Sequence, residues 1–328
     1  MIMPSITIRG SGAIQIRQLA LTLRCMKDAA DRNPLHLLRV FPLLLTSCGR
    51  LDTLLYEPPI TPAQWCQQRP CIELSSGSIL NEPFGTTLVF FLAGLWIAAG
   101  VYEFTIRDAQ KSRVWLAIAL ILGGIGAALA GTSFQAFSYE LKCAGREHCL
   151  WTNGFEIGYN LAQAASVSAM LIAVAYACTT GRVRRGLIRY SIVNVVAYFV
   201  VTSIGVLRAE RFLLSFDMLM LFALPGLIAV LAISGLRYRR LRDGMDLALL
   251  GAGVWLVATF VSYYGYYAAG LTQAFWRGGQ GFYFSENDVL HIGMALWIVY
   301  VALFLARRLR DADDTGTAFE RRLAPGER

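Results

Sequence analysis

The sequence has little charge for its length: only 16% of its 328 residues are charged, whereas 56% are hydrophobic, and the mean hydropathy is +0.50. Soluble domains carry about a quarter charged residues, and a soluble chain of this length normally forms two charge-covered domains. A soluble globular fold is therefore excluded, and we expect lipid to face much of the chain. The net charge of +8 does not indicate nucleic-acid binding, because the arginines form short clusters between apolar runs.

Common catalytic motifs are also missing. The sequence has no dinucleotide-binding or P-loop motif, no CxxC cluster, and no Ser-His-Asp set built around a nucleophile elbow. Gly123, Gly124 and Gly126 lie within one apolar run and have no strand-turn-helix context. They predict close packing between membrane helices instead of a nucleotide site.

What the sequence does have is seven apolar runs of about 20 residues, the length that crosses a hydrocarbon core of ~30 Å. Because backbone polar groups in lipid must be satisfied within the segment, each run predicts a helix. The fold class expected is an all-α, polytopic membrane protein. The predicted spans are Thr86–Ile106, Val114–Phe137, Phe155–Cys178, Leu187–Leu207, Phe212–Gly235, Asp246–Tyr267 and Val289–Leu305.

The basic residues predict the orientation. The connections 1–2, 3–4 and 5–6 and the C-terminal tail hold 17 Lys and Arg residues, against seven on the other side from Cys48 onward. Since cytoplasmic loops carry the excess of positive charge, the N-terminus is expected outside and the C-terminus in the cytoplasm. The expected location is the cytoplasmic membrane of a bacterium.

The cysteines agree with this orientation. Cys66, Cys71, Cys143 and Cys149 all lie on the predicted outer side, where an oxidising compartment permits disulfides. The simplest pairs are Cys66–Cys71 and Cys143–Cys149, although cross-pairing between the two loops is also open. Zinc is the competing interpretation, but no histidine accompanies the first pair. Cys178 is expected to be a free, small apolar residue.

The ends of the chain carry the weakest signals. Residues 1–47 are either an N-terminal extension or, if translation starts at Met26, a signal segment whose Leu45-Thr46-Ser47-Cys48 resembles a lipoprotein cleavage box. Residues 48–85 form a Cys-containing extracytoplasmic segment, residues 86–307 the seven-helix domain, and residues 308–328 a cytoplasmic tail without ordered structure.

Polar side chains from five predicted spans share one depth, the outer third of the membrane. Ionisable groups at this depth are costly and suggest a functional site. Each also has a structural interpretation: the tyrosines as an interfacial belt, the acids as helix N-terminal groups, and the histidine as a hydrogen-bonded core residue. The convergent residues are Ser133, Gln135, Glu156, Asn160, Asp217, Tyr263, Tyr267, Asp288 and His291.

This pattern resembles the alkaline ceramidase family, in the superfamily of seven-span hydrolases that includes the progestin and adiponectin receptors. The resemblance covers about residues 65–305. Its elements are Gln64-Trp65-Cys66-Gln67, the run Glu82–Thr87, Ser133 near the end of span 2, Glu156 at the start of span 3, and Asn287–His291 at the start of span 7.

The resemblance implies a lipid-amide hydrolase in which three histidines hold a catalytic zinc. Here Phe137 and Asn287 stand at two of those histidine positions, and only His291 remains. The set expected to hold Zn or another divalent metal is therefore His291, Glu156 and Asp288. The calcium site of the family also loses its acidic and Asn ligands, since Gln64, Gln67 and Arg69 replace them.

Two functions follow as hypotheses, both with a membrane lipid or another amphiphile as the ligand. In the first, water is activated either by a metal on His291, Glu156 and Asp288 or by His291 acting directly as general base, and the hydroxyl of Ser133 stabilises the oxyanion. The residues expected to line the pocket are Gln135, Asn160, Asp217, Tyr263, Tyr267 and Asp288. In the second, the protein is a non-catalytic lipid-binding sensor, receptor-like protein or scaffold with a degenerate active site. An ion or proton carrier is disfavoured, because only Asn194 places polar chemistry toward the inner side.

Overall fold

The computed structural model describes residues 48–105, 110–278 and 283–312. The chain separates into two units, Met1–Gly49 and Arg50–Arg328, and all seven spans belong to the second. The predictions for residues 1–47 and for the tail beyond residue 312 lie outside the described residues.

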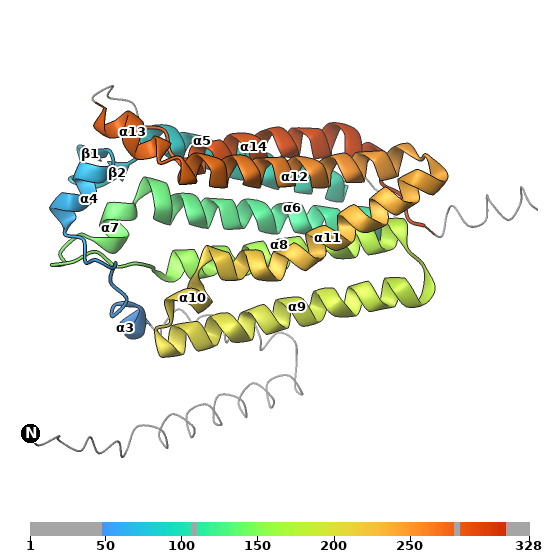
Figure 1. Ribbon diagram of the computed structural model, residues 1–328, viewed down its shortest axis with the longest axis horizontal. Helices are drawn as coiled ribbons and strands as arrows, with labels where there is room; N and C mark the ends of the chain where they lie inside the picture. Colours follow the sequence, from blue (N-terminus) through green and yellow to red (C-terminus); the bar gives the residue numbers. More distant parts are fainter. Residues whose placement is uncertain (1–47, 106–109, 279–282, 313–328) are drawn as a thin grey trace, which may run out of the picture. The chain divides into compact units, whose positions relative to one another are not determined.

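The described part of the chain contains seven long apolar helices (Figure 1), and the protein is an integral multi-pass membrane protein. The all-α, seven-span fold class predicted from the sequence is confirmed. The spans are α5 (Pro83–Thr105), α6 (Lys111–Ala130) with the π-helical η2 (Gly131–Ala136), α8 (Gly154–Cys178), α9 (Gly181–Arg208), α11 (Phe216–Leu241), α12 (Gly244–Ala268), and α14 (Glu286–Tyr300) with η3 (Val301–Leu305) and η4 (Ala306–Arg308).

The predicted span limits agree with these helices within a few residues, except in the fourth and fifth spans. Helix α9 begins six residues before the predicted Leu187, because the basic turn after Gly181 is helical. The predicted start of the fifth span at Phe212 falls in a separate short helix, α10 (Arg211–Leu214). Ser215 interrupts the chain there, since its extended backbone lets the side chain accept a hydrogen bond from Met218 N and begin α11.

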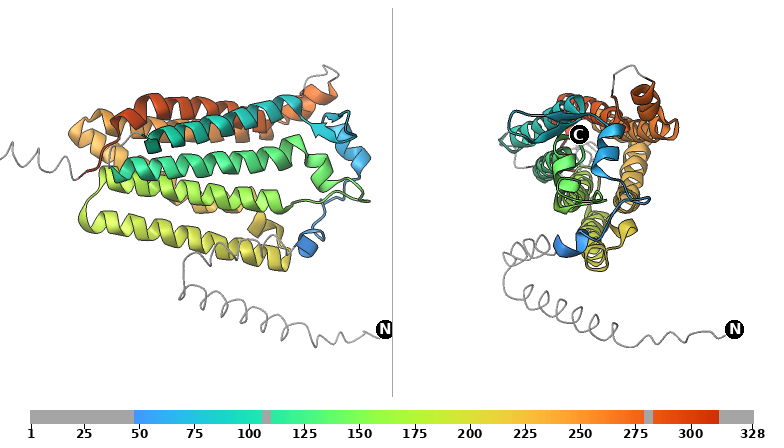
Figure 2. Two further views of the ribbon diagram at one scale, coloured as in Figure 1. Left: turned by 180° about the vertical axis from the view of Figure 1, so that it is seen from behind. Right: turned by 90° about the vertical axis from the view of Figure 1, so that its left-hand side faces the viewer.

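Six of the spans form a closed ring, and α9 lies outside it (Figure 2, right). Around the ring, α5 packs on α6, α6 on α8, α8 on α11, α11 on α12, α12 on α14, and α14 on α5. Helix α9 packs mainly on the outer side of α8. The ring therefore closes without its seventh helix, and any site in its interior belongs to six helices.

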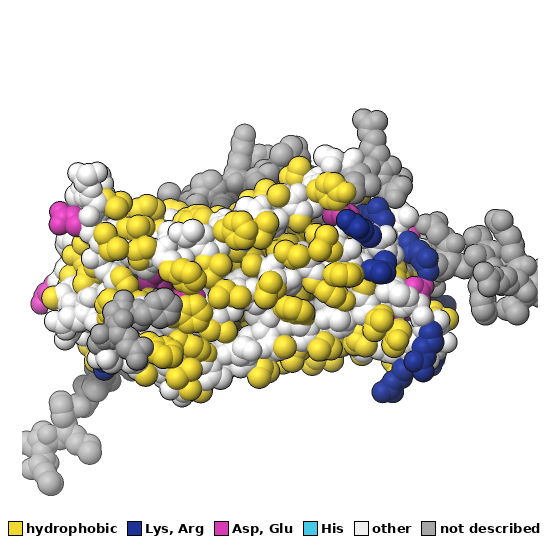
Figure 3. Space-filling view, turned by 90° about the horizontal axis from the view of Figure 1, so that it is seen from above, with side chains coloured by type: hydrophobic (Ala, Val, Ile, Leu, Met, Phe, Trp, Pro, Cys, Tyr) yellow, Lys and Arg dark blue, Asp and Glu magenta, His cyan; other side chains and the backbone are white. Residues whose placement is uncertain are grey.

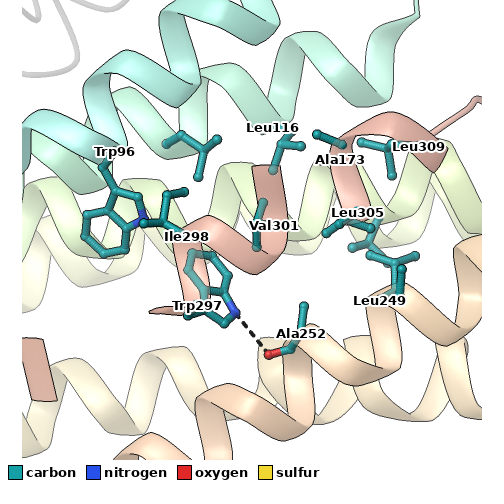
Figure 4. Packing of buried hydrophobic residues seen from close by; sticks show 14 of the residues in the cluster. Trp96, Leu116, Ala173, Leu249, Ala252, Trp297, Ile298, Val301, Leu305 and Leu309 are labelled. Carbon is teal, nitrogen blue, oxygen red and sulfur yellow. Dashed lines mark hydrogen bonds between the residues drawn. The ribbon is translucent and has the colours of Figure 1, made fainter. Parts of the chain in front are cut away.

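The largest apolar cluster joins α5, α6, α8, α12 and α14 (Figure 4). Trp96 and Trp297 meet edge to face with ring centroids 6.1 Å apart. The indole of Trp297 also donates to the carbonyl of Ala252 at 3.0 Å, a carbonyl within α12. Aromatic pairs of this geometry contribute beyond their buried area, so this pair holds α14 between α5 and α12.

Glycines let α5 and α6 approach closely, as the sequence predicts. A Cβ added at Gly124 would lie 2.6 Å from Ile97 Cγ1 and 2.9 Å from the carbonyl oxygen of Ala93. At Gly100, on the facing helix, it would lie 2.9 Å from the carbonyl of Ala117. Backbone atoms cannot move aside as the end of a flexible side chain can, so both positions require glycine.

Gly124→Ala is expected to destabilise the protein by about 1–3 kcal/mol, because the new methyl forces the two helices apart. The same substitution at Gly94, where a Cβ meets nothing within 4 Å, is the matched control. There, the higher helix propensity of alanine predicts unchanged or slightly raised stability. Detergent-induced unfolding of the two variants measures the difference, and equal midpoints would contradict the close-packing argument.

One end of the ring carries short elements and both disulfides, and is called the disulfide end. The short elements are α3 (Cys48–Leu51), α4 (Pro62–Gln68), the hairpin of β1 (Cys71–Glu73) and β2 (Ile79–Asn81), α7 (Ser138–Lys142) and α13 (Leu271–Arg277). The pairs Cys66–Cys71 and Cys143–Cys149 are both formed, which confirms the simplest predicted connectivity. Cys178 is free and buried, also as predicted.

Candidate functional site

A cavity of about 1100 Å³ lies inside the ring and is lined by side chains from all six of its helices. Most of the residues that line the cavity are apolar. Its polar residues gather toward the disulfide end, where α6 and α12 finish and α11 and α14 begin. Ligand sites typically have volumes of ~300–1000 Å³, with mostly apolar walls and a few polar groups. The cavity is thus large enough for an amphiphile. The polar lining residues are Gln135, Gln163, Ser166, Asp217, Asn287, His291, Tyr159, Tyr263 and Tyr264.

His291 and Gln135 meet on the wall of this cavity. The distance between Gln135 Nε2 and His291 Nδ1 is 3.4 Å. With the amide NH₂ group of Gln135 as the donor, Nδ1 is the acceptor, and a neutral imidazole then carries its proton on Nε2. The side chain of Gln135 is almost fully buried, and its Oε1 has no partner among the described residues. A free buried acceptor beside an imidazole is suited to a ligand that carries a hydroxyl or amide N–H.

Glu156 and Ser133 belong to a different cluster, centred on Lys142. The Lys142 ammonium forms an ion pair with Glu156 Oε1, and their side chains are only 2% and 6% exposed. Ser133 Oγ donates to the same carboxylate oxygen at 2.8 Å. Asn153, the N-cap residue of α8, donates to Ser133 Oγ at 2.7 Å. These residues are the ion-pair cluster: Ser133, Lys142, Asn153 and Glu156.

Further contacts hold Lys142 in place. Its ammonium donates to the carbonyl of Trp151 at 3.1 Å and lies 5.0 Å from the ring centroid of Phe134. Burial by itself would lower the pKa of Lys142, but the neighbouring Glu156 carboxylate outweighs it and holds the pKa above its ordinary value. Lys142 therefore remains charged, and Glu156 has a permanent counter-ion.

The three residues predicted to be catalytic consequently do not share one surface. His291 lines the cavity, whereas Ser133 and Glu156 are absent from its lining and bond to each other and to Lys142. Ser133 and Gln135 are two residues apart in η2, and residues at that spacing do not face each other. The π-helical turn thus presents one side chain to the ion-pair cluster and the other to the cavity.

The predicted metal ligands also have separate partners. His291 pairs with Gln135, and Glu156 with Lys142. Asp288 Oδ2 accepts from the backbone N of Ser285 at 2.6 Å and from its hydroxyl at 3.0 Å, in a capping box that begins α14. In the described parts of the chain, no three His, Cys, Asp or Glu side chains group as metal ligands. The set does not fit a shared metal ion, and we derive no chemistry from one.

The residues predicted to line the pocket divide into two groups. Gln135, Asp217 and Tyr263 lie on the cavity wall. Three others do not line it: Asp288 caps α14, Asn160 Nδ2 donates to the carbonyl of Leu214 at 3.1 Å and so ties α8 to α10, and Tyr267 is 65% exposed. Asp217 is exposed in the first turn of α11, where the helix dipole favours an acid, so it needs no buried partner.

Two functional groups at the disulfide end escape the sequence-based prediction. Lys142 enters it only as one of the charges counted in the connection between the second and third spans, where it directly precedes Cys143. Glu82, directly before α5, is 3% exposed and lies 3.4 Å from Arg69 Nη1 and 3.2 Å from Tyr283 OH. Its burial raises its pKa from 4.5 to about 7, in spite of the neighbouring Arg69.

Comparison with known proteins adds no family. No protein-family model matches the chain. No curated protein matches it either. The likeness to alkaline ceramidases therefore depends on the topology and the single residues given above.

Proposed function

We propose that the protein binds an amphiphilic lipid in the ring cavity, as a non-catalytic sensor, receptor-like protein or scaffold. The observation that carries the proposal is the form of the cavity: a mostly apolar space lined by six spans, with its polar groups toward one end. An acyl chain would occupy the apolar length, and a headgroup would meet Gln135 and His291. The free Oε1 of Gln135 would accept a hydrogen bond from that headgroup.

The ion-pair cluster favours binding over catalysis. A carboxylate that is neutralised by an adjacent ammonium is a poor general base, and the hydroxyl of Ser133 already donates to that carboxylate. An oxyanion hole needs donors that are free to meet the developing charge. Of the predicted catalytic residues, His291 alone lines the chamber.

The proposal is tested by blocking the cavity. Ala223 on α11 lines it, and Ala223→Trp is expected to reduce the lipid that copurifies with the full-length protein about tenfold, because overpacking costs about 1–3 kcal/mol. Ala232→Trp adds the same side chain on the exposed side of the same helix and is the matched control. Mass spectrometry of the extracted lipid measures the ratio. Equal amounts of bound lipid in the two variants would overturn the proposal.

A second candidate is the lipid-amide hydrolase, which the position of His291 on the cavity wall favours. The hydrogen bond from Gln135 to Nδ1 would have to open first. The freed Nδ1 would then take a proton from water as the water oxygen attacks the amide carbon, the C–N bond would break, and the imidazolium would return the proton to the leaving amine, giving a fatty acid and an amine. Purified wild-type protein would then cleave ceramide or another acyl-amide lipid, and His291→Ala would abolish cleavage while the fold is kept. No cleavage by wild type, combined with lipid loss in Ala223→Trp only, decides for binding alone.

A further inference from the structure

The end of the ring opposite the disulfides carries a second, polar pocket of about 420 Å³. It is lined by four arginines and a single acid, Asp243. We call it the arginine pocket, after its lining residues Arg113, Arg307, Arg308 and Arg310. Figure 3 shows Lys and Arg side chains gathered at one end of the molecule, and apolar side chains along the rest of that face.

The arginines converge from separate segments. Arg113 lies in the first turn of α6 and donates through Nε to the carbonyl of Leu309 at 3.1 Å. Arg307 and Arg308 end the seventh span, and Arg310 follows it. Arg307, Arg308 and Arg310 are exposed, so solvent screens the repulsion among the guanidinium groups, and an anion bound between them would reduce it further.

The one acid among the described lining residues, Asp243, is already engaged at both oxygens. Asp243 Oδ2 forms an ion pair with Arg310, and Oδ1 caps α12 by accepting from Met245 N at 2.9 Å. Arg308 Nη1 donates to the carbonyl of Phe304 at 2.8 Å. Arg307 is exposed and has no hydrogen bond or ion pair within the described residues. Within the described residues, Arg307 and Arg308 thus line the pocket without a carboxylate partner.

Carboxylates of the chain already bind at this end. Asp311 accepts from the backbone N of Lys111 at 3.0 Å and of Ser112 at 2.9 Å, at the N-terminus of α6. Asp243 does the same at the N-terminus of α12. Two helix N-termini with their positive dipole ends therefore flank the pocket, and both bind oxyanions.

The depth of the pocket indicates which anion it meets. It lies where the second and sixth spans begin and the seventh ends, and the ends of helices long enough to cross the hydrocarbon core meet the lipid headgroups. Guanidinium groups bind phosphate oxygens in a bidentate manner, and basic pockets between membrane helices recognise anionic headgroups. We infer that the arginine pocket binds the phosphate of an anionic phospholipid headgroup, in a site separate from the ring cavity.

The test is a lipid titration of the full-length protein in detergent micelles, followed by native mass spectrometry. Phosphatidylglycerol is compared with zwitterionic phosphatidylcholine, and inorganic phosphate is added as a competitor. Wild type is expected to bind phosphatidylglycerol about tenfold more tightly than phosphatidylcholine. The Ala223→Trp variant is expected to keep this binding, which separates the arginine pocket from the ring cavity.

Arg307→Gln is the informative substitution, because Arg307 is exposed and forms no hydrogen bond or ion pair with the rest of the described chain. It is expected to weaken phosphatidylglycerol binding about tenfold. Arg185→Gln removes an equal charge from an exposed position outside the pocket and is expected to weaken binding less than about twofold. Equal loss in both variants, or equal binding of the two lipids, would overturn the inference. Displacement by inorganic phosphate at the concentration of the lipid would also overturn it, in favour of a soluble ion.

Discussion

Lys142→Met is expected to destabilise the protein by about 3–5 kcal/mol, because it leaves the buried carboxylate of Glu156 without a counter-ion. The hydrogen bond from Ser133 would remain but would not neutralise the charge. The measurement is unfolding in SDS, followed by tryptophan fluorescence. The effect should appear at the disulfide end first, since Lys142 also contacts the carbonyl of Trp151.

Two further variants separate the loss of the pair from the loss of a lysine. In Lys142→Met/Glu156→Gln no buried charge remains, so most of the lost stability should return. Lys111→Met removes an exposed lysine and is expected to change stability by less than about 0.5 kcal/mol. If the double variant were as unstable as Lys142→Met, packing of the lysine stem and not charge would be its main contribution.

Glu82 is expected to make stability depend on pH, in the direction opposite to an ordinary ion-paired acid. Its pKa is about 7 in the folded protein and near 4.5 in the unfolded chain, so the folded state binds the proton more tightly. The stabilisation from protonated Glu82 is complete below about pH 4.5 and is lost as the pH rises through about 7. A difference of this size corresponds to about 3 kcal/mol.

The measurement is the difference between wild type and Glu82→Gln in unfolding midpoint across this pH range. Other groups titrate in both proteins and cancel in the difference, whereas the part that belongs to Glu82 disappears in the variant. We expect the wild type to lose stability relative to the variant between pH 5 and 8. Parallel curves would show that Arg69 and Tyr283 keep Glu82 ionised throughout.

The spans follow from the sequence because hydrocarbon thickness and backbone satisfaction leave little choice for long apolar runs. Both disulfides were also predictable, since five- and six-residue separations bring each pair close wherever the loops lie. The break at Ser215 was not, because Phe212–Leu214 is as apolar as the helix that follows. Hydropathy does not register a capping side chain.

The sequence predicts how deep in the membrane each residue of the candidate site lies, but not how its helix is rotated about the helix axis. Membrane position places Ser133, Glu156 and His291 at one level, yet it does not say which way each side chain points around its helix. The spacing of Ser133 and Gln135 did contain that information, because residues two apart on a helix face different neighbours. The sequence does not predict the partner of Glu156, because Lys142, at the end of α7, comes close to Glu156 only in the folded structure.

The indole side chains in the wall of the cavity are an intrinsic fluorescent probe of what the cavity binds. Of the seven tryptophans in the chain, Trp96 and Trp297 border the cavity. Trp96 lies on α5 and Trp297 on α14, and the two rings meet edge to face where these helices pack together. Emission from a buried indole responds to the polarity and quenching groups of whatever lies against it. Binding of a brominated acyl chain would therefore be detected as quenching of the intrinsic tryptophan fluorescence, without a label or an engineered residue.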